Sequence, residues 1–462
     1  MSSDYQLLII GSGPAGYVAG IRAAQLGIKA AVVEKGKPGG VCLNIGCIPS
    51  KALIHQAELF RSLPELEKTG VTFDTSGFDY GTVFAASRKA ADTLSKGVKF
   101  LLKKNKVDLI EGEAVISSPG EITLTGGRKL TAEHILIATG SSPREIPGFE
   151  FNGTDILSSD HALMLESLPE SLLILGGGAI GCEFAHIMNA FGVDVTIVEM
   201  MDHLLPTEDA DNAAILQRSF KKRKITVKTG TVAKGYDRKD GKITVHLEGP
   251  DGKKEEKEAE KVLVVVGRAP NTAGLGLDTV GITPEKGCIP VGDYYRTSVP
   301  SIYAAGDVIN TPQLAHLASK EAEIAVEHIA GIAREKAADP GLVPGAVYCE
   351  PQVAGFGLTE EKAAKNNVPF KTSVFPYRGA GKSVALGKLE GQVKIIFDPD
   401  TKEILGAGVV GENATELIHE LLLAKKAELL PEDLATMIHA HPTLSETIME
   451  AARGAEGWMI HA

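Results

Sequence analysis

Two cysteines set five positions apart are the residues of this chain best suited to chemistry. Cys42 and Cys47 stand in the segment Gly39 to Lys51, which reads GGVCLNIGCIPSK. In a regular helix this separation is a rise of about 7.5 Å, whereas the Cα atoms of a disulfide lie about 4.4–6.8 Å apart. A disulfide here therefore needs an irregular turn, and the three glycines of the segment permit one.

A close cysteine pair in a chain with five cysteines indicates redox chemistry rather than a secreted disulfide framework. A metal site and a pair of inert buried thiols are the two alternatives. No other Cys or His lies at metal-ligand spacing from the pair, so we expect no metal.

Thiol chemistry at neutral pH needs a base, because the thiolate is the nucleophile. Near the C-terminus the segment HAHPTLSE contains His441 and Glu446, and a histidine held by a carboxylate is the usual form of an oriented base. Thr443 and Glu446 also have the spacing of a helix capping box, so Glu446 could instead cap a helix expected over Thr443–Ala452. Both interpretations remain open on the sequence.

Two segments of the chain have the same pattern, and they must position this chemistry. Gly11–Gly16 reads GSGPAG and Gly176–Gly181 reads GGGAIG, and each follows an apolar strand and begins a helix. In both units an acidic residue, Glu34 or Glu199, comes 23 positions after the first glycine. Each is a complete βαβ dinucleotide fingerprint. The expected strands are Tyr5–Ile10, Ala30–Val33, Leu172–Leu175 and Val193–Val198.

The two fingerprints predict two nucleotide cofactors. Glycines let the backbone approach a pyrophosphate at a helix N-terminus, and the acidic residue bonds the ribose hydroxyls. A 2'-phosphate would be repelled by Glu199, so the nicotinamide cofactor should be NAD. A redox disulfide, a flavin and NAD each accept or give two electrons at a time, so an electron pair can pass from one centre to the next.

Length and composition limit the remaining possibilities. A chain of 462 residues should form two to four domains, and the strands and helices expected from about residue 345 predict a C-terminal α+β domain. The net charge of −11 argues against a nucleic-acid partner. No apolar run approaches the length of a membrane span, so a cytoplasmic location is the default expectation.

Several motifs, spread over essentially the whole chain, resemble those of the pyridine nucleotide-disulfide oxidoreductases. Besides the cysteine segment and the fingerprints, they are ATG at Ala138–Gly140, VVVGRAPNT at Val264–Thr272, YAAGDV at Tyr303–Val308 and HPTLSE at His441–Glu446. The resemblance implies an α/β fold with two Rossmann-like βαβ domains and a C-terminal α+β dimerisation domain. The implied domains are an FAD domain (1–148), an NAD domain (149–271), a central domain (272–342) and an interface domain (343–462).

The resemblance also implies roles for individual residues. Cys42 would exchange with substrate, Cys47 would face the flavin, and His441 with Glu446 from the partner subunit would be the acid–base pair. Lys51 would lie by the flavin, paired with Glu183, and the His441–Pro442 bond would be cis. The implied FAD residues are Gly11, Gly13, Pro14, Ala15, Gly16, Glu34, Lys35, Gly40, Val41, Cys42, Lys51, Ala114, Thr139, Gly140, Gly306, Asp307, Leu314 and Ala315. The implied NAD residues are Gly176, Gly178, Ala179, Ile180, Gly181, Glu183, Glu199, Val232 and Gly267.

Within the family the chain is most similar to the members that oxidise dihydrolipoamide to lipoamide. This implies a homodimer whose partners are lipoyl domains of 2-oxo acid dehydrogenase acyltransferases or a glycine-cleavage carrier protein. Glutathione-type reductases are a rival, but they would carry basic residues after the second fingerprint, where this chain has Met200, Met201 and Asp202. A mercuric reductase would end in a further cysteine pair, and a transhydrogenase would lack the first cysteine. A role as a docking subunit is compatible with catalysis.

Overall fold

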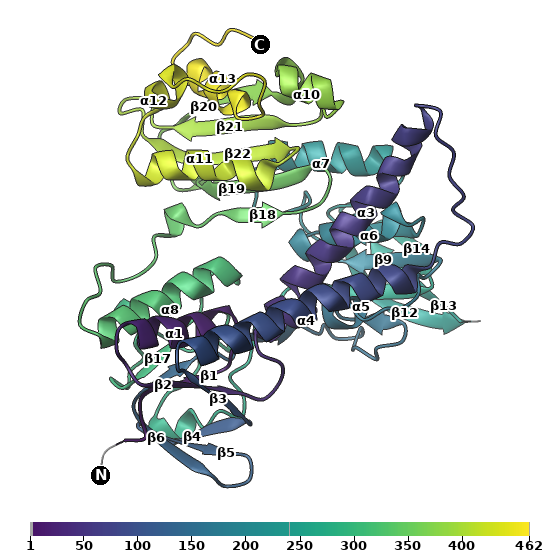
Figure 1. Cartoon of the computed structure of the whole chain (residues 1–462). Helices are drawn as coiled ribbons and strands as arrows, with labels where there is room; N and C mark the ends of the chain where they lie inside the picture. The colour runs from purple at the N-terminus through teal and green to yellow at the C-terminus, as the bar shows by residue number, and fades with distance from the viewer. Residues whose placement is uncertain (1–2, 240, 462) are drawn as a thin grey trace.

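The computed structural model describes residues 3–239 and 241–461 (Figure 1). Its strands form three main bodies, two of them built on parallel sheets and the last on an antiparallel sheet. The expected α/β fold is therefore confirmed. Among the described residues, no helix combines the length and the apolar character needed to cross a membrane.

The first sheet positions the first fingerprint. Its parallel strands lie in the order β3-β2-β1-β6, with β17 beside β6, and β5 and β4 continue the sheet antiparallel. Residues Leu7–Ile10 of β1 are buried, so this strand lies in the core. The strands are β1 (Tyr5–Ile10), β2 (Ala30–Glu34), β3 (Asp108–Glu111), β4 (Ala114–Ser118), β5 (Glu121–Leu124), β6 (Lys129–Ile137) and β17 (Ile302–Ala304).

The second sheet repeats this arrangement for the second fingerprint. It is parallel in the order β11-β10-β9-β15-β8, and an antiparallel sheet of β12, β13 and β14 packs beside it. Residues 251–261 read DGKKEEKEAEK, with charges of both signs, and this segment includes β14 of the smaller sheet. The strands are β8 (Ile156–Leu157), β9 (Ser171–Leu175), β10 (Asp194–Val198), β11 (Thr226–Lys228), β12 (Val232–Lys239), β13 (Lys242–Glu248), β14 (Lys254–Ala259) and β15 (Lys261–Val264).

The C-terminal sheet is antiparallel in the order β18-β19-β22-β21-β20. Helix α11 (Ala414–Lys426) packs on β19 and β22, and α13 (Glu446–Ala455) packs on β20 and β21. The helix expected over Thr443–Ala452 begins three residues later, because the Thr443 amide bonds the Glu446 side chain before the first helical residue. The strands are β18 (Gly345–Val347), β19 (Gln352–Gly357), β20 (Lys371–Pro376), β21 (Gln392–Phe397) and β22 (Ile404–Gly411).

Long helices connect these bodies. Helix α3 packs against α4 and also against α6, so it joins the first body to the second (Figure 1). Helix α8 packs against α1, and α7 packs against the C-terminal sheet. The remaining elements are α1 (Pro14–Gln25), α2 (Gly40–Ile45), α3 (Cys47–Glu67), α4 (Tyr80–Lys104), α5 (Ser159–Ala162), α6 (Ala179–Ala190), α7 (Ala210–Lys222), α8 (Ala315–Ile329), α9 (Glu360–Lys365), α10 (Gly381–Leu386), α12 (Pro431–Thr436), β7 (Ser141–Pro143) and β16 (Arg268–Pro270).

Candidate active site

The two cysteines lie on either side of a break between helices. Cys42 is in α2, Cys47 begins α3, and Gly46 separates the two helices. A Cβ on Gly46 would lie 2.9 Å from the Val41 carbonyl oxygen, so only glycine fits at this break. The irregular turn that the spacing required is therefore present, and it brings the two thiols into hydrogen-bonding contact.

The two thiols differ in acidity. The hydrogen bond to Cys47, burial and the charge of Cys47 together raise the pKa of Cys42. The pKa of Cys47 is lowered, because the Cys42 thiol donates to it and Lys51 lies nearby, and these effects outweigh burial. In the dithiol state the proton therefore resides on Cys42 and the thiolate on Cys47.

Lys51 connects the thiols to the second body of the protein. Its Nζ lies 2.9 and 3.0 Å from the two carboxylate oxygens of Glu183, which belongs to α6. Nζ also lies 4.5 Å from the centre of the Tyr348 ring, and the Tyr348 amide donates to Glu183. Burial lowers the pKa of Lys51, but Glu183 outweighs it, so the pKa is raised and the ammonium is retained. The pairing of Lys51 with Glu183 is as expected.

The first fingerprint forms a tight turn before α1. A Cβ on Gly11 would lie 2.4 Å from the Ala138 carbonyl oxygen, and one on Gly16 would lie 1.8 Å from the Gly11 carbonyl oxygen. A Cβ on Gly13 meets no atom within 4 Å, and no side chain caps the helix that follows. Free amides and open space at a helix N-terminus fit a pyrophosphate. The Glu34 carboxylate accepts from the amides of Ser12, at 2.8 Å, and Gly36, at 2.7 Å.

The second fingerprint repeats this geometry before α6. A Cβ on Gly181 would lie 2.0 Å from the Gly176 carbonyl oxygen, whereas one on Gly178 meets no atom within 4 Å. The Glu199 carboxylate accepts from the amides of Gly177, at 2.6 Å, and Met201, at 2.8 Å. The two turns therefore fit two dinucleotides in the same manner.

Other expected FAD residues gather around the first turn. Gly40 approaches so closely that its Cβ would lie 2.7 Å from the Cα of Gly13, and a Cβ on Gly306 would lie 3.6 Å from that of Ala15. Asp307 accepts from Ser141 at 2.5 Å. Thr139 and Gly140 lie in the loop that follows β6. Leu314 is the N-cap residue of α8, Ala315 is its first residue, and Val41 lies in α2.

Some expected cofactor residues make other contacts. Lys35 forms an exposed ion pair with Glu113, and Ala114 is buried in β4 opposite Leu124. On the second body, Val232 begins β12 and is half exposed, and Gly267 has a left-handed φ of 121° beside β16. Their part in cofactor binding stays a prediction.

His441 and Glu446 form the expected pair, whereas the expected capping box is not formed, because α13 begins at Glu446 and no side chain caps it. The His441 Nδ1 lies 2.9 Å from Oε1 of Glu446, while Oε2 accepts the amide of Thr443 at 2.8 Å. The His441–Pro442 bond is cis, as expected. The His441 side chain is 77% exposed, so its Nε2 edge faces outward from the chain.

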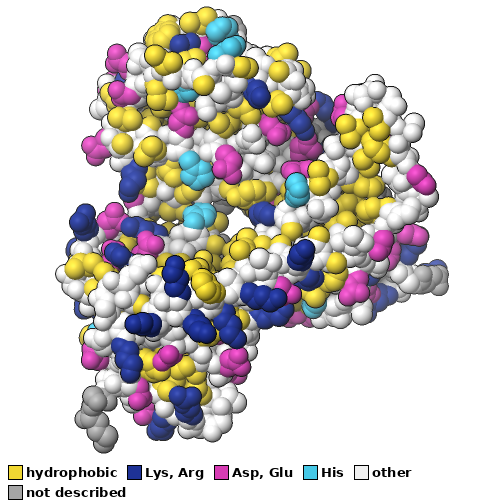
Figure 2. All heavy atoms as spheres, in the orientation of Figure 1, with side chains coloured by type: hydrophobic (Ala, Val, Ile, Leu, Met, Phe, Trp, Pro, Cys, Tyr) yellow, Lys and Arg dark blue, Asp and Glu magenta, His cyan; other side chains and the backbone are white. Residues whose placement is uncertain are grey.

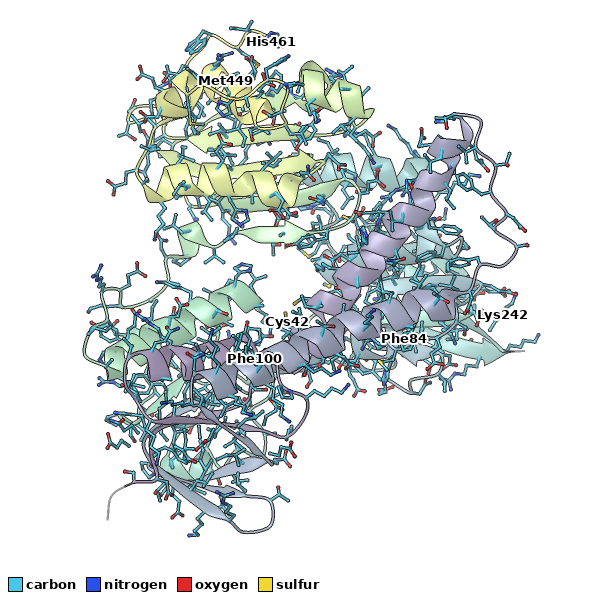
Figure 3. The ribbon with its side chains drawn as sticks, viewed as in Figure 1. Cys42, Phe84, Phe100, Lys242, Met449 and His461 are labelled. Carbon is cyan, nitrogen blue, oxygen red and sulfur yellow. The ribbon has the colours of Figure 1, made fainter. Side chains whose placement is uncertain are left out.

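The acid–base pair and the thiols stand apart within one chain. Figure 3 places Cys42 at the centre of the molecule and Met449 of α13 in the C-terminal lobe. Within the part of the chain that the structure describes, no hydrogen bond or ion pair joins His441 or Glu446 to Cys42 or Cys47. The surface is hollowed between the C-terminal lobe and the lobe of the first sheet (Figure 2).

Sequence reasoning missed several residues of this site. Tyr348 and Ser141 carry no local motif that would identify them, because they meet Lys51 and Asp307 only through the fold. Ser12 lies inside the first fingerprint, so its contact with Glu34 could have been anticipated. His439, two residues before His441, bonds Glu420 and had a signal in the repeated histidine of the HAH segment.

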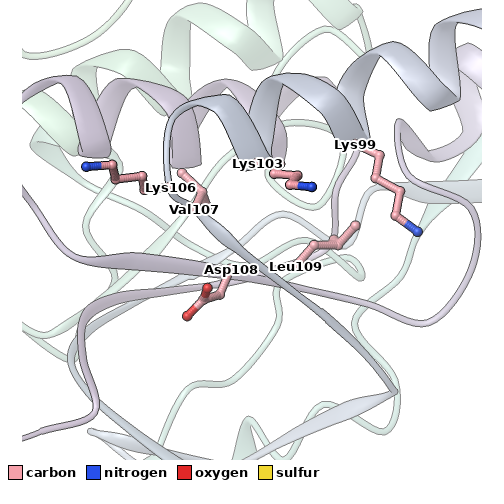
Figure 4. Close-up of a pocket in the computed structure, with 6 residues that line it drawn as sticks. All are labelled: Lys99, Lys103, Lys106, Val107, Asp108 and Leu109. Atoms are coloured by element: carbon pink, nitrogen blue, oxygen red, sulfur yellow. The ribbon is translucent and has the colours of Figure 1, made fainter.

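A pocket of about 270 Å³ lies outside this site, where the last turn of α4 crosses β3 (Figure 4). Its lining residues are Lys99, Lys103, Lys106, Val107, Asp108 and Leu109. None of them is an expected cofactor or catalytic residue, so the pocket lies apart from the thiol and nucleotide chemistry.

Two family models match the chain. The pyridine nucleotide-disulphide oxidoreductase model matches residues 5–322, and the dimerisation domain of the same family matches residues 343–452. The dihydrolipoyl dehydrogenase of Rhizobium etli is 42% identical, and that of Bacillus subtilis is 43% identical, each over 100% of both chains.

Solved structures give the same likeness. LpdA from Mycobacterium tuberculosis superposes with a TM-score of 0.88 at 30% identity, covering 97% of this chain and 99% of that one. The HOCl-induced flavoprotein disulfide reductase RclA from Escherichia coli, a Cu(II) complex, superposes with a TM-score of 0.86 at 26% identity, covering 98% and 99%.

Proposed function

The chain belongs to the pyridine nucleotide-disulphide oxidoreductases, a premise from which we propose that it oxidises dihydrolipoamide to lipoamide with reduction of NAD. It is a flavoprotein disulfide oxidoreductase whose cofactors are FAD and NAD. The choice of dihydrolipoamide is supported by relatives that are similar over their full length and carry that name.

The observation that carries the proposal is the place of the dithiol between two nucleotide turns. Cys42 and Cys47 directly follow the first βαβ unit, and the Lys51–Glu183 pair ties them to α6, the helix that begins at the second fingerprint. Electrons from a substrate dithiol would therefore enter at the Cys42–Cys47 segment, which lies next to both cofactor sites.

The residues divide the chemistry among them. In the proposed cycle, His441 takes a proton from dihydrolipoamide, and the substrate thiolate attacks Cys42 of the oxidised disulfide. This attack breaks the Cys42–Cys47 bond and releases Cys47 as a thiolate. The second substrate thiol closes the lipoamide ring and releases Cys42 as a thiol, so the substrate loses two electrons and the enzyme disulfide gains them. Cys47 is then the thiolate, as its lowered pKa requires. FAD supplies a two-electron acceptor and NAD a hydride acceptor when they are bound.

The site needs a second subunit under this proposal. The chain carries the family's dimerisation domain, and the exposed His441 is separate from the thiols of its own chain. We propose that His441 and Glu446 of one subunit serve the thiols of the other. The proposed macromolecular partners are lipoyl domains of 2-oxo acid dehydrogenase acyltransferases or a glycine-cleavage carrier.

Anaerobic reduction of the purified holoenzyme with dihydrolipoamide tests the proposal. We expect a long-wavelength thiolate-to-flavin absorption band to form, and addition of NAD should discharge it with formation of NADH. A flavin that stays oxidised with dihydrolipoamide but is reduced by NADH would remove the substrate assignment. Glutathione-type disulfides would then be tested as substrates with NADH and with NADPH.

A further inference from the structure

A second histidine lies in the same loop as His441, and it is buried. The loop runs from the end of α12 to the start of α13 and contains His439 two residues before His441. The His439 side chain is 3% exposed, whereas that of His441 is 77% exposed. The two histidines of one short loop therefore have opposite environments.

Both ring nitrogens of His439 face acceptors. Nε2 lies 2.8 Å from the Glu420 carboxylate, and Nδ1 lies 3.1 Å from the Met437 carbonyl oxygen. A neutral imidazole has one N–H and could donate to one of these acceptors, whereas an imidazolium donates to both. The His439 ring is therefore held between Glu420 and the backbone of its own loop, with its side chain inside the protein.

This pair fixes the loop to the rest of the C-terminal domain. Glu420 belongs to α11, the helix that packs on β19 and β22, so the loop is attached to a rigid element. The bond from Nδ1 to the Met437 carbonyl holds the loop's own backbone on the other side of the ring. His441, whose side chain projects from the surface, is then held by Glu446 and by this loop.

We propose that His439 and Glu420 are a positioning pair for the acid–base loop: they hold His441 in the orientation that proton transfer needs. The proposal rests on the function proposed above for His441. Neither residue of the pair is assigned contact with substrate or cofactor.

The charge of His439 also acts on the acid–base pair. Burial raises the pKa of Glu446, but the Thr443 amide, His441 and His439 outweigh it and hold the pKa below its usual value. The charged groups around His439 are Glu420 from α11, Glu446 from α13 and His441 of its own loop. Removal of His439 should therefore raise the pKa of Glu446, the carboxylate that bonds His441, because one nearby positive group is lost.

His439→Gln in the holoenzyme is the direct test. We expect kcat/KM for dihydrolipoamide to fall by about 10- to 100-fold, and its pH profile to differ from that of the wild type. Glu420→Gln should show a similar loss of rate, and the double variant should lose little more, because the residues act as one unit. Electron transfer from NADH to ferricyanide should remain unchanged. His246→Gln is the matched control, since it removes a histidine–carboxylate pair on β13.

A second measurement does not depend on dihydrolipoamide. After reduction with NADH, the rate at which iodoacetamide alkylates Cys42 reports the pH at which its thiolate forms. In His439→Gln a displaced His441 stabilises this thiolate less, so alkylation should require a higher pH. A purely structural loss of stability would not move this profile.

The outcomes separate the two proposals. If wild-type enzyme fails with dihydrolipoamide, the substrate assignment falls, and the alkylation profile still decides the role of His439. If His439→Gln is folded and matches wild type in both pH profiles, the positioning role is wrong. If His439→Gln does not fold, Glu420→Gln, which keeps the side-chain size, takes its place, and wild-type behaviour there overturns the inference.

Discussion

Cys47 sits between two opposite charges, and each should be visible in its titration. Lys51 lowers the pKa of Cys47, whereas Glu183 raises it. In Lys51→Ala the thiolate should form at a pH higher by about one unit, since a cation near an acid typically shifts its pKa by about 1–3 units. Glu183→Gln should shift formation to lower pH. The measurement is the long-wavelength band of the dithiol enzyme against pH, and a shift of the same sign in both variants would contradict the assignment.

A substitution of His441 should affect the oxidation of dihydrolipoamide but not the reduction of the flavin by NADH. His441→Gln should lower the rate of dihydrolipoamide oxidation by about 100- to 10,000-fold, the usual range for loss of a general base. Reduction of the flavin by NADH should be spared, because His441 takes its proton from dihydrolipoamide in the proposed cycle and has no part in hydride transfer from NADH. Stopped-flow absorbance measures each half-reaction, and full-rate oxidation of dihydrolipoamide by His441→Gln would remove His441 from the mechanism.

At the level of elements, each nucleotide turn contains two kinds of glycine. One kind is needed for close packing, and the other leaves room for a ligand. A Cβ at Gly181 would strike the Gly176 carbonyl, so Gly181→Ala should cost about 1–3 kcal/mol of stability. Gly178 has ordinary extended backbone and open space, so Gly178→Ala should fold normally. It should raise the KM for NAD by about 10-fold or more, because the methyl group occupies the pyrophosphate position.

Thermal unfolding and NAD kinetics on the two alanine variants check this contrast. Gly178→Ala should also keep its flavin and accept electrons from dihydrolipoamide at the wild-type rate. A destabilised Gly178→Ala, or an unchanged KM for NAD, would mean that this turn does not hold the dinucleotide.

The sequence predicted the elements of these turns well because their determinants are local. Strand β1 was expected and found over Tyr5–Ile10, since its apolar run follows the polar Asp4 and stops at Gly11. The start of α13 was expected three residues too early, because Thr443 and Glu446 form their cap-like bond before the helix begins. The contacts of Tyr348 and Lys394 join residues far apart in sequence, and a single sequence carries no signal for such pairs.

On the scale of the whole molecule, a buried lysine joins the second body to the C-terminal sheet. Lys394 of β21 is 2% exposed and lies 2.8 Å from Asp209, 2.6 Å from Asp211 and 2.7 Å from Glu360. Asp209 caps the start of α7, which lies beside β22 in Figure 1. The position of α7 against this sheet therefore depends on the ion pairs that Lys394 forms with these three carboxylates.

Removing this cation should leave a buried carboxylate without compensation. Lys394→Met should lower the unfolding free energy by about 3–5 kcal/mol, the usual cost of breaking a buried pair. Adding Asp209→Asn to this variant should recover part of the loss. Denaturant unfolding measures both effects, and Lys365→Met, at an exposed lysine, is the control. If Lys394→Met were as stable as Lys365→Met, the role of the cluster would be contradicted.

The separation of His441 from the thiols has a consequence for genetics. In a dimer whose sites are shared as proposed, a Cys42→Ser allele and a His441→Gln allele are each inactive alone. A mixed dimer has one site in which both defects meet and one in which both wild-type residues meet. Random mixing should restore about one quarter of wild-type activity. Two defective alleles in one cell would then complement each other, although neither encodes a working protein.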